Sequence, residues 1–404
     1  MRSACKDACR QTRDDVQSLI SKGRDIDSAR FDSTVFLETM RNVPPIDQAT
    51  GTYMTFKVRI EPSGHEFVAE GSETILEAAL RHGFNLPYSC RNGACATCKG
   101  KVIMGSVDYG VYEAKALNEA EKLTGMALFC RARPLSDVVI EVREIGAARG
   151  ITIKTLPCRV VRMERLAHDV MVLHLKLPQS ERLQFLAGQY IDILLRDGRR
   201  RSFSLANAPH DDEALQLHVR LLPGGHFSGH VFTHMKEKDL LRFQGPLGTF
   251  FLREEDAPAG VNSFAVERPA ILMAGGTGFA PIKSILEHAF YVGTQRPLHL
   301  YWGARARRDL YLHALVQSWV EAHANFRYTP VLSEPDPNDH WDGRCGWVHD
   351  AVVQDYPDLS GHEIYASGPP PMIEAGRLAF SAHGLPADRL FYDSFERARD
   401  LVVQ

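Results

Sequence analysis

The sequence PYSCRNGACATCK occupies residues 87–99 and contains three cysteines, Cys90, Cys95 and Cys98, with four and then two residues between them. The fourth cysteine of the pattern, Cys130, follows after 31 intervening residues. This spacing is typical of a 2Fe–2S cluster, because four thiolates are required to hold two irons. Gly93, Ala94, Ala96 and Thr97 between the cysteines are small, which allows backbone N–H groups to turn toward the sulfurs and stabilise their charge.

These four cysteines could instead be buried core residues, or they could bind zinc. Zinc sites usually use paired C-x2-C knuckles, and this stretch has only one such pair. The four cysteines are therefore predicted to be cluster ligands. Cys158 and Cys345 match no motif and are predicted to be small core residues, whereas Cys5 and Cys9 are predicted to be ordinary exposed thiols.

The residues before the cysteines predict two strands and a helix. The run MTFKVRI from Met54 alternates like a strand, a turn follows at Pro62, and apolar residues recur at helical spacing from Ile75. Together with the cysteines, this order resembles the plant-type ferredoxin domain over residues 54–146. The resemblance implies a β-grasp fold, with the four cysteines on that family's ligand positions.

Composition limits the classes of function. The chain has 404 residues, 44% of them hydrophobic and 24% charged, as expected for a globular protein of two to four domains. The net charge of −3 disfavours general binding to nucleic acid or anionic membranes.

No stretch approaches the ~20 apolar residues of a membrane span, and the N-terminus lacks a secretory signal, so a cytoplasmic protein is expected. Residues 1–52 are predicted to be an extension, which a natural start at Met54 would remove.

A small, polar stretch at 146–150, GAARG, is predicted to link this domain to a region of short strands. In that region the run from Arg199 to Asn207 could be only a charged edge strand. Alternatively, Arg201 pairs with a pyrophosphate, Phe203 stacks on a flat ring and Ser204 donates a hydrogen bond to the ring's edge. A glycine loop containing Gly225 and Ser228 then precedes a helix, where N–H groups can bind phosphate. These motifs resemble the FAD-binding barrel of the ferredoxin-NADP reductase superfamily, in which tyrosine usually occupies the position of Phe203.

The sequence MAGGTGFAP at 273–281 ends a strand and opens a helix, so its glycines can approach a dinucleotide pyrophosphate. Two further segments, WGAR at 302–305 and SGPPPM at 367–372, each follow a strand, where ligands of parallel sheets bind. The three segments resemble the nicotinamide-nucleotide domain of the same superfamily. The predicted nucleotide-binding residues are Gly275, Gly276, Thr277, Gly278, Arg305, Gly368 and Pro369.

The resemblance also implies which residues lie beside the reacting rings. Ser367 occupies the position where many relatives have cysteine next to the nicotinamide. Phe395 is the candidate for the aromatic residue that covers the flavin ring, and with Ser204 these are the predicted catalytic residues. Arg305, Arg307 and Arg308 could hold the 2′-phosphate of NADPH, whereas Asp309 could favour the ribose of NADH; similarity of GARxxxDLY to NADH-using relatives favours NADH.

The predicted fold is thus multidomain α+β and α/β. A β-grasp ferredoxin domain (54–146) precedes an antiparallel β-barrel FAD domain (153–257) and a parallel α/β nucleotide-binding domain (266–404). The predicted cofactors are a 2Fe–2S cluster, FAD and NADH, with NADPH as an alternative. Such a chain would convert a two-electron hydride into single electrons for a partner protein.

In domain order and in phrases such as FLAGQYIDILLRDGRRRSFSLANAP (185–209) and GPLGTFFLRE (245–254), residues 54–395 resemble the CDP-6-deoxy-Δ3,4-glucoseen reductase family. That family passes electrons to a separate dehydrase. Reductase components of oxygenases share the three domains and are the alternative, and an electron carrier without enzymatic activity is a further one.

Overall fold

The computed structural model describes residues 54–146, 150–253 and 268–396, which we call the cluster module, the barrel module and the nucleotide module. The predicted extension at 1–52 and the predicted boundary between 257 and 266 lie outside these ranges. In the part of the chain that is described, no helix is long and apolar enough to cross a membrane.

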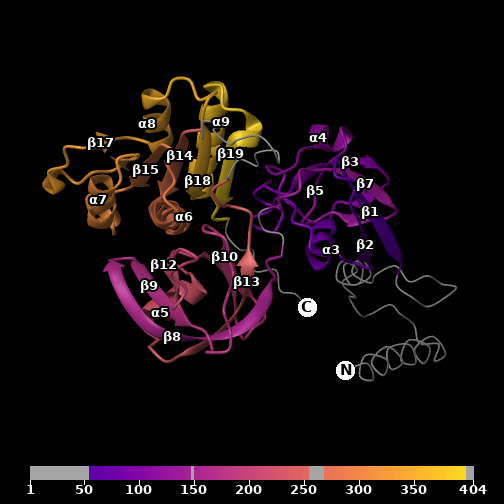
Figure 1. Ribbon diagram of the computed structural model, residues 1–404, viewed down its shortest axis with the longest axis horizontal. Coiled ribbons are helices and arrows are strands. Elements are labelled where there is room, and N and C mark those ends of the chain that lie inside the picture. Colours follow the sequence, from indigo (N-terminus) through magenta and orange to yellow (C-terminus); the bar gives the residue numbers. More distant parts are fainter. Residues whose placement is uncertain (1–53, 147–149, 254–267, 397–404) are drawn as a thin grey trace, which may run out of the picture. The chain divides into compact units, whose positions relative to one another are not determined.

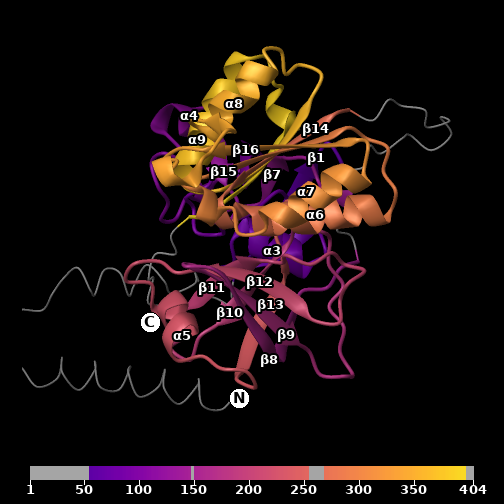
Figure 2. The same ribbon diagram turned by 90° about the vertical axis from the view of Figure 1, so that its left-hand side faces the viewer.

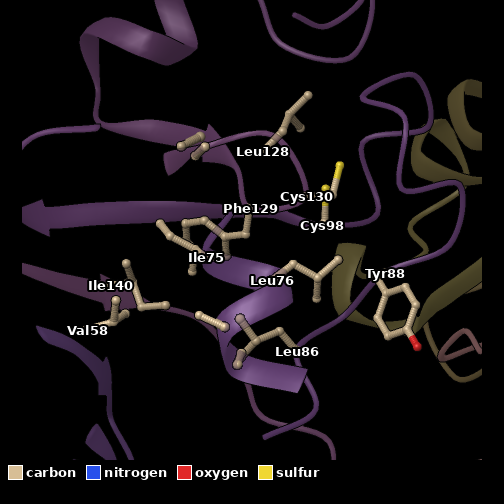
Figure 3. Packing of buried hydrophobic residues seen from close by; sticks show 14 of the residues in the cluster. Val58, Ile75, Leu76, Leu86, Tyr88, Cys98, Leu128, Phe129, Cys130 and Ile140 are labelled. Atoms are coloured by element: carbon tan, nitrogen blue, oxygen red, sulfur yellow. The ribbon is translucent and has the colours of Figure 1, made fainter. Parts of the chain in front are cut away.

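The cluster module is built on one mixed sheet with the strand order β2-β1-β7-β3-β5 (Figure 1). Its elements are β1 (Thr55–Glu61), β2 (Glu66–Glu70), α3 (Ile75–Arg81), β3 (Lys99–Met104), β4 (Val107–Asp108), α4 (Glu119–Leu123), β5 (Met126–Leu128), β6 (Arg133–Pro134) and β7 (Val138–Glu141). Helix α3 is capped by Thr74, whose hydroxyl accepts from the Glu77 N–H while the Glu77 carboxylate accepts from the Thr74 N–H. Alternate residues of β1 face inward, and Val58 and Ile140 lie in one core with Ile75 and Leu76 of α3 (Figure 3). The predicted β-grasp arrangement is confirmed.

The barrel module is a six-stranded antiparallel sheet with the order β11-β10-β13-β8-β9-β12. Its elements are β8 (Lys154–Ala167), β9 (Val170–Lys176), β10 (Tyr190–Leu194), β11 (Arg200–Ser204), β12 (Leu215–Arg220), α5 (His226–Thr233) and β13 (Leu240–Leu247). A bridge between Leu205 and Leu217 joins the two outer strands, β11 and β12. The sheet therefore closes on itself as the predicted barrel, and Cys158 is buried inside it as expected.

The nucleotide module is a fully parallel sheet with the order β17-β16-β15-β14-β18-β19. Its strands and helices are β14 (Ala270–Gly275), α6 (Phe279–Tyr291), β15 (Leu298–Ala304), α7 (His313–Ala322), β16 (Phe326–Leu332), β17 (Arg344–Cys345), α8 (Val348–Asp355), β18 (Glu363–Gly368), α9 (Pro370–Ala382) and β19 (Leu390–Ser394), and its short 3-10 helices are η2 (Gly276–Gly278), η3 (Arg307–Asp309), η4 (Pro337–Asp339) and η5 (Ala387–Arg389). The strand order reverses between β14 and β18, and ligands of such sheets bind at that point.

Both faces of this sheet are covered. Figure 2 shows α6 and α7 on one face and α8 and α9 on the other. Alternate residues of β14 enter the two cores accordingly, with Leu272 packing beside α6 and Met273 beside α8 and α9. The prediction that Cys345 is a core residue is wrong: its side chain is exposed, because β17 is a two-residue edge strand.

A buried ion pair fixes the start of β18, which suggests a test of stability. Arg296 Nη2 donates to Glu363 Oε2 at 2.6 Å, the two side chains are only 6% and 8% exposed, and Tyr365 donates to the same oxygen at 2.7 Å. Glu363→Ala would leave the guanidinium buried without its carboxylate, so we expect it to lower the free energy of unfolding by about 3–5 kcal/mol. Thermal unfolding measures the effect. Glu181→Ala, which removes the partner of Lys154 at the surface, should lower the free energy of unfolding by about 1 kcal/mol or less. Equal losses of stability in Glu363→Ala and Glu181→Ala would contradict the expectation.

Candidate redox centres

The four predicted cluster ligands come together in the structure. Cys90, Cys95 and Cys98 lie in the loop between α3 and β3, and Cys130 follows β5. All except Cys90 are buried. The loop turns tightly around the thiols through residues with positive φ, namely Arg91 (55°), Gly93 (80°) and Ala96 (63°).

The thiols form two pairs. Cys90 is hydrogen-bonded to Cys95, and Cys98 is hydrogen-bonded to Cys130. The sulfurs of Cys98 and Cys130 lie side by side in Figure 3. A single tetrahedral zinc would require all four sulfurs within about 3.8 Å of one another. Yet in the described part of the chain no three of these sulfurs lie within 4.8 Å of one another. Two pairs of thiols fit two irons, each of which takes two thiolates.

The loop is also built to stabilise negative charge on sulfur. The pKa of the Cys90 thiol is lowered to about 6, mainly by the hydrogen bond from Cys95 and further by the backbone N–H groups of Asn92, Ala94 and Cys95, against the opposing effect of burial. Such N–H donors are the interactions that tune an iron–sulfur site. The residues present therefore fit the 2Fe–2S cluster.

The two predicted flavin motifs meet in the barrel module. Arg201, Phe203 and Ser204 lie on β11, and the Phe203 ring packs against Phe227 of α5 at a centroid distance of 5.3 Å. Gly225 is the N-cap of α5 and supplies no capping side chain, so the first-turn N–H groups remain suited to a phosphate.

The loop before α5 is held by its own serine. The Ser228 hydroxyl accepts from the Leu222 N–H at 3.2 Å and donates to the Gly225 carbonyl at 3.3 Å. A Cβ atom at position 225 would clash with this hydroxyl. A larger residue here would displace the Ser228 hydroxyl from the turn, and the first-turn N–H groups of α5 remain the feature that suits a phosphate.

All of the predicted nucleotide-binding residues except Arg305 gather at the carboxyl ends of β14 and β18, where the strand order reverses. A Cβ atom at Gly278 would clash with the Ser367 backbone, and one at Gly275 with Pro369 and Met372. Within the described residues, the fully buried Ser367 hydroxyl has no hydrogen-bond partner. An orphaned buried donor beside a glycine-lined strand end fits a polar ligand such as a nicotinamide.

The residues that were predicted to distinguish NADPH from NADH make different contacts in the structure. Arg305 is exposed just beyond β15. The Arg307 backbone N–H and guanidinium donate to Asp339, at 3.2 and 3.1 Å. Asp309 accepts from the Ala306 N–H at 3.1 Å, which closes η3.

Sequence reasoning missed one residue where the modules meet. Asp393 on β19 accepts hydrogen bonds from Ser204 of the barrel module at 3.1 Å and from Ser89 of the cluster module at 2.7 Å. Burial raises the pKa of this carboxyl group. The only signal in the sequence was an acidic residue within the apolar run FYDSF. Two residues later the Phe395 N–H donates to the Gly368 carbonyl at 3.0 Å, so the backbone of this residue lies beside the segment that is predicted to bind the nucleotide.

Comparison with known proteins agrees with this geometry. Three family models match: a 2Fe-2S iron-sulfur cluster binding domain over residues 58–135, an oxidoreductase FAD-binding domain over 157–252 and an oxidoreductase NAD-binding domain over 272–377. The chain is 40% identical to the CDP-6-deoxy-L-threo-D-glycero-4-hexulose-3-dehydrase reductase of Yersinia pestis, over 85% of this chain and 99% of that protein. It belongs to the family of three-domain iron–sulfur flavoprotein reductases.

Other relatives deliver electrons to different systems. This reductase is 38% identical to the reductase subunit of an aromatic O-demethylase from Amycolatopsis, over 85% of this chain and all of that one. Its structure is similar to the cytochrome P450 reductase GcoB of Amycolatopsis, with a TM-score of 0.70 and 35% identity over 85% of this chain and all of that one. The predictions of fold, of an NAD(P)H-dependent oxidoreductase and of 2Fe–2S, FAD and NAD(H) as its cofactors are confirmed.

Proposed function

We propose that this reductase takes hydride from NADH and delivers the electrons, through FAD and the 2Fe–2S cluster, to a separate dehydrase that acts on a CDP-linked 6-deoxyhexulose. The observation that carries the proposal is the 40% identity to the dehydrase reductase of Yersinia over nearly the whole of that protein. The second candidate acceptor is an oxygenase, which the 38% identity to the O-demethylase reductase subunit supports.

The two acceptors are distinguished by a direct assay. The purified reductase is mixed with NADH and either a CDP-hexulose dehydrase with its sugar substrate or an aromatic oxygenase with its substrate, and the product is measured. We expect at least about tenfold faster product formation with the dehydrase, the ratio that about 1.4 kcal/mol of preferential recognition gives. Equal or faster turnover with the oxygenase would reverse the assignment.

The residue roles in the barrel module are proposals of the same kind. FAD, when bound, accepts hydride as an electron pair and releases electrons singly. Arg201 neutralises its pyrophosphate, Phe203 supports the flat ring, and Gly225 with Ser228 shapes the phosphate loop. Ser204 is proposed to lie at the ring edge, but its single hydroxyl proton is donated to Asp393 in the structure, so it would meet the ring as an acceptor rather than as the predicted donor.

The nucleotide is held at the carboxyl ends of β14 and β18. Gly275, Gly276, Thr277 and Gly278 let the backbone approach the pyrophosphate, and Gly368 and Pro369 line the opposite side, with Arg305 beyond β15. The Ser367 hydroxyl donates a hydrogen bond to the nicotinamide, and Phe395 covers the flavin ring. A reducing compartment such as the cytoplasm is proposed as well, because the cluster needs free thiols.

Arg201→Ala tests the flavin assignment. The charge-assisted hydrogen bonds of a guanidinium contribute about 1.5–3 kcal/mol, so the variant should bind FAD roughly tenfold to 150-fold more weakly. Bound flavin per chain, measured by absorbance after gel filtration, gives the result. Arg182→Ala removes another arginine of the barrel module, one that pairs with Asp212 at the surface, and should retain its flavin. Unchanged flavin content in Arg201→Ala would rule out this role.

The proposed nucleotide is NADH, because Arg307 donates to Asp339 and is therefore not available to a 2′-phosphate. NADPH would bring a 2′-phosphate that lacks a full set of cationic partners. We expect kcat/KM to be about tenfold higher with NADH, the equivalent of one charge-assisted hydrogen bond. Steady-state ferricyanide reduction with each nucleotide measures this ratio, and a higher value with NADPH would contradict the preference.

A further inference from the structure

Two neighbouring side chains of β19 reach the loop that carries the first cluster ligands. The Tyr392 hydroxyl donates to the Cys95 carbonyl at 2.9 Å, and Asp393 Oδ1 accepts from the Ser89 hydroxyl at 2.7 Å. Ser89 immediately precedes the ligand Cys90, and Cys95 is itself a ligand. One strand of the nucleotide module therefore holds both ends of the ligand loop 89–95.

The same carboxylate also reaches the strand assigned to the flavin. Asp393 Oδ2 accepts from Ser204 on β11 at 3.1 Å, so one side chain, only 7% exposed, joins all three modules. A buried carboxylate with two neutral hydroxyl donors adds little stability, because burying an ionisable group costs more than two such bonds return. The position of this carboxylate is better understood as a means of fixing the three modules relative to one another.

The barrel module supports the loop from its other side. The Tyr190 hydroxyl donates to the Ser89 carbonyl at 2.6 Å, and Thr249 exchanges hydrogen bonds with the Tyr88 backbone, at 3.0 Å in both directions. Arg91, the residue after the first ligand, pairs with the buried Asp192 of β10. The segment 88–91 is thus fixed to the barrel, while Tyr392 and Asp393 add contacts from the nucleotide module.

We propose that Tyr392 and Asp393 are positioning residues for electron transfer inside the chain: they hold the ligand loop 89–95 at a fixed separation from the flavin-binding strand β11. The rate of electron transfer falls steeply with distance, so a small displacement of the loop slows it. In each transfer the flavin site loses the one electron that the cluster site gains, and over the two transfers the hydrogen that arrived as hydride leaves the flavin site as a proton. Two transfers account for the two electrons of one NADH, whose oxidation releases one proton. This inference rests on the proposed flavin position at Ser204.

The test uses the full-length protein loaded with both cofactors, and the variants Tyr392→Phe and Ser89→Ala. Ser89→Ala removes the contact with Asp393, and Tyr392→Phe removes the hydroxyl contacts with Cys95 and Thr97. Neither replaced residue is a predicted catalytic or nucleotide-binding residue. Their matched controls are Tyr356→Phe, which removes a hydroxyl contact with His299, and Ser284→Ala, which removes a buried bond to the Asn207 carbonyl. Iron and sulfide analysis establishes that every variant retains its cluster.

Two readouts separate positioning from general stability. Stopped-flow absorbance after mixing with NADH should show cluster reduction slowed roughly tenfold to hundredfold in Tyr392→Phe and Ser89→Ala, while ferricyanide reduction stays within about twofold. Amide hydrogen exchange of residues 89–98, measured by mass spectrometry in the absence of NADH, should be faster in these variants and unchanged in the controls.

The inference is overturned if cluster reduction is unaffected, if ferricyanide reduction falls to the same extent, or if the controls behave like the two variants. Failure of the flavin assignment has a different signature. Arg201→Ala would then retain FAD, while faster exchange in the loop of Tyr392→Phe would still be seen. Loss of cluster from Tyr392→Phe or Ser89→Ala would show a structural role and likewise overturn the inference.

Discussion

A Cys98→Ser protein is expected to lose NADH-dependent reduction of cytochrome c while it continues to reduce ferricyanide with NADH. Cys98 is buried and paired with Cys130, so the substitution removes one of the two thiolates from one iron and the cluster cannot be held. Ferricyanide takes electrons from the flavin directly, whereas cytochrome c takes them through the cluster. The expected loss is that of nearly the whole cytochrome c activity, because no second route exists in this scheme.

Cys345→Ser is the matched control for this experiment. Cys345 is exposed on β17 and takes no part in the ligand set, so this variant should keep both activities and the reddish-brown absorbance of the cluster. Cytochrome c reduction that survives in Cys98→Ser, in a protein whose iron analysis shows no cluster, would mean that the flavin itself reduces the protein acceptor. The order of cofactors proposed above would then be wrong.

The second large effect is expected for Gly278→Ala. A Cβ atom there would collide with the Ser367 carbonyl group and the Gly368 N–H, and the clash involves backbone on both sides, so no side-chain rotation relieves it. Overpacking of this kind costs about 1–3 kcal/mol. Because the distortion falls where the nicotinamide nucleotide is proposed to bind, NADH should bind about five- to 150-fold more weakly.

Gly361→Ala provides the comparison, since a Cβ atom at Gly361 meets nothing within 4 Å. Steady-state kinetics with NADH and ferricyanide give KM and kcat for both variants, and FAD and iron contents establish that the other two sites are intact. An unchanged KM in Gly278→Ala would place the nucleotide away from β14 and β18. An equal rise of the KM for NADH in Gly361→Ala would show that the effect of Gly278→Ala is not specific to that position.

The features that could be predicted from the sequence are those that depend on residues close together in the chain. The cysteine spacing at residues 90–98 predicted a cluster correctly, because a loop of fixed length around two irons leaves little freedom in residue number. A similar local rule underlies the expectation for Gly275, Gly276 and Gly278, whose lack of a side chain would allow the backbone to approach a pyrophosphate, and this role stays a prediction. Cys345 was assigned wrongly to the core, because a single apolar residue carries no information about whether its strand is central or at an edge.

Asp393 shows what local sequence could not supply. Its partners Ser89 and Ser204 are separated from it by 304 and 189 positions along the chain, and no periodicity or spacing links residues that far apart. Tyr392 is similar, with its partner Cys95 at a separation of 297 positions. These contacts exist only because the three modules are packed into one unit.

The chemistry of this reductase, namely an iron–sulfur cluster, a flavin and a nicotinamide nucleotide, could be predicted from short segments whose residue types and spacing follow from the geometry of each ligand. How the cluster loop is held against the proposed flavin-binding strand became visible only in the folded chain, where one buried carboxylate and one tyrosine hydroxyl on β19 join them. The physical reason is that ligand loops are local, whereas the path between redox centres is made of contacts between segments that meet only when the chain has folded.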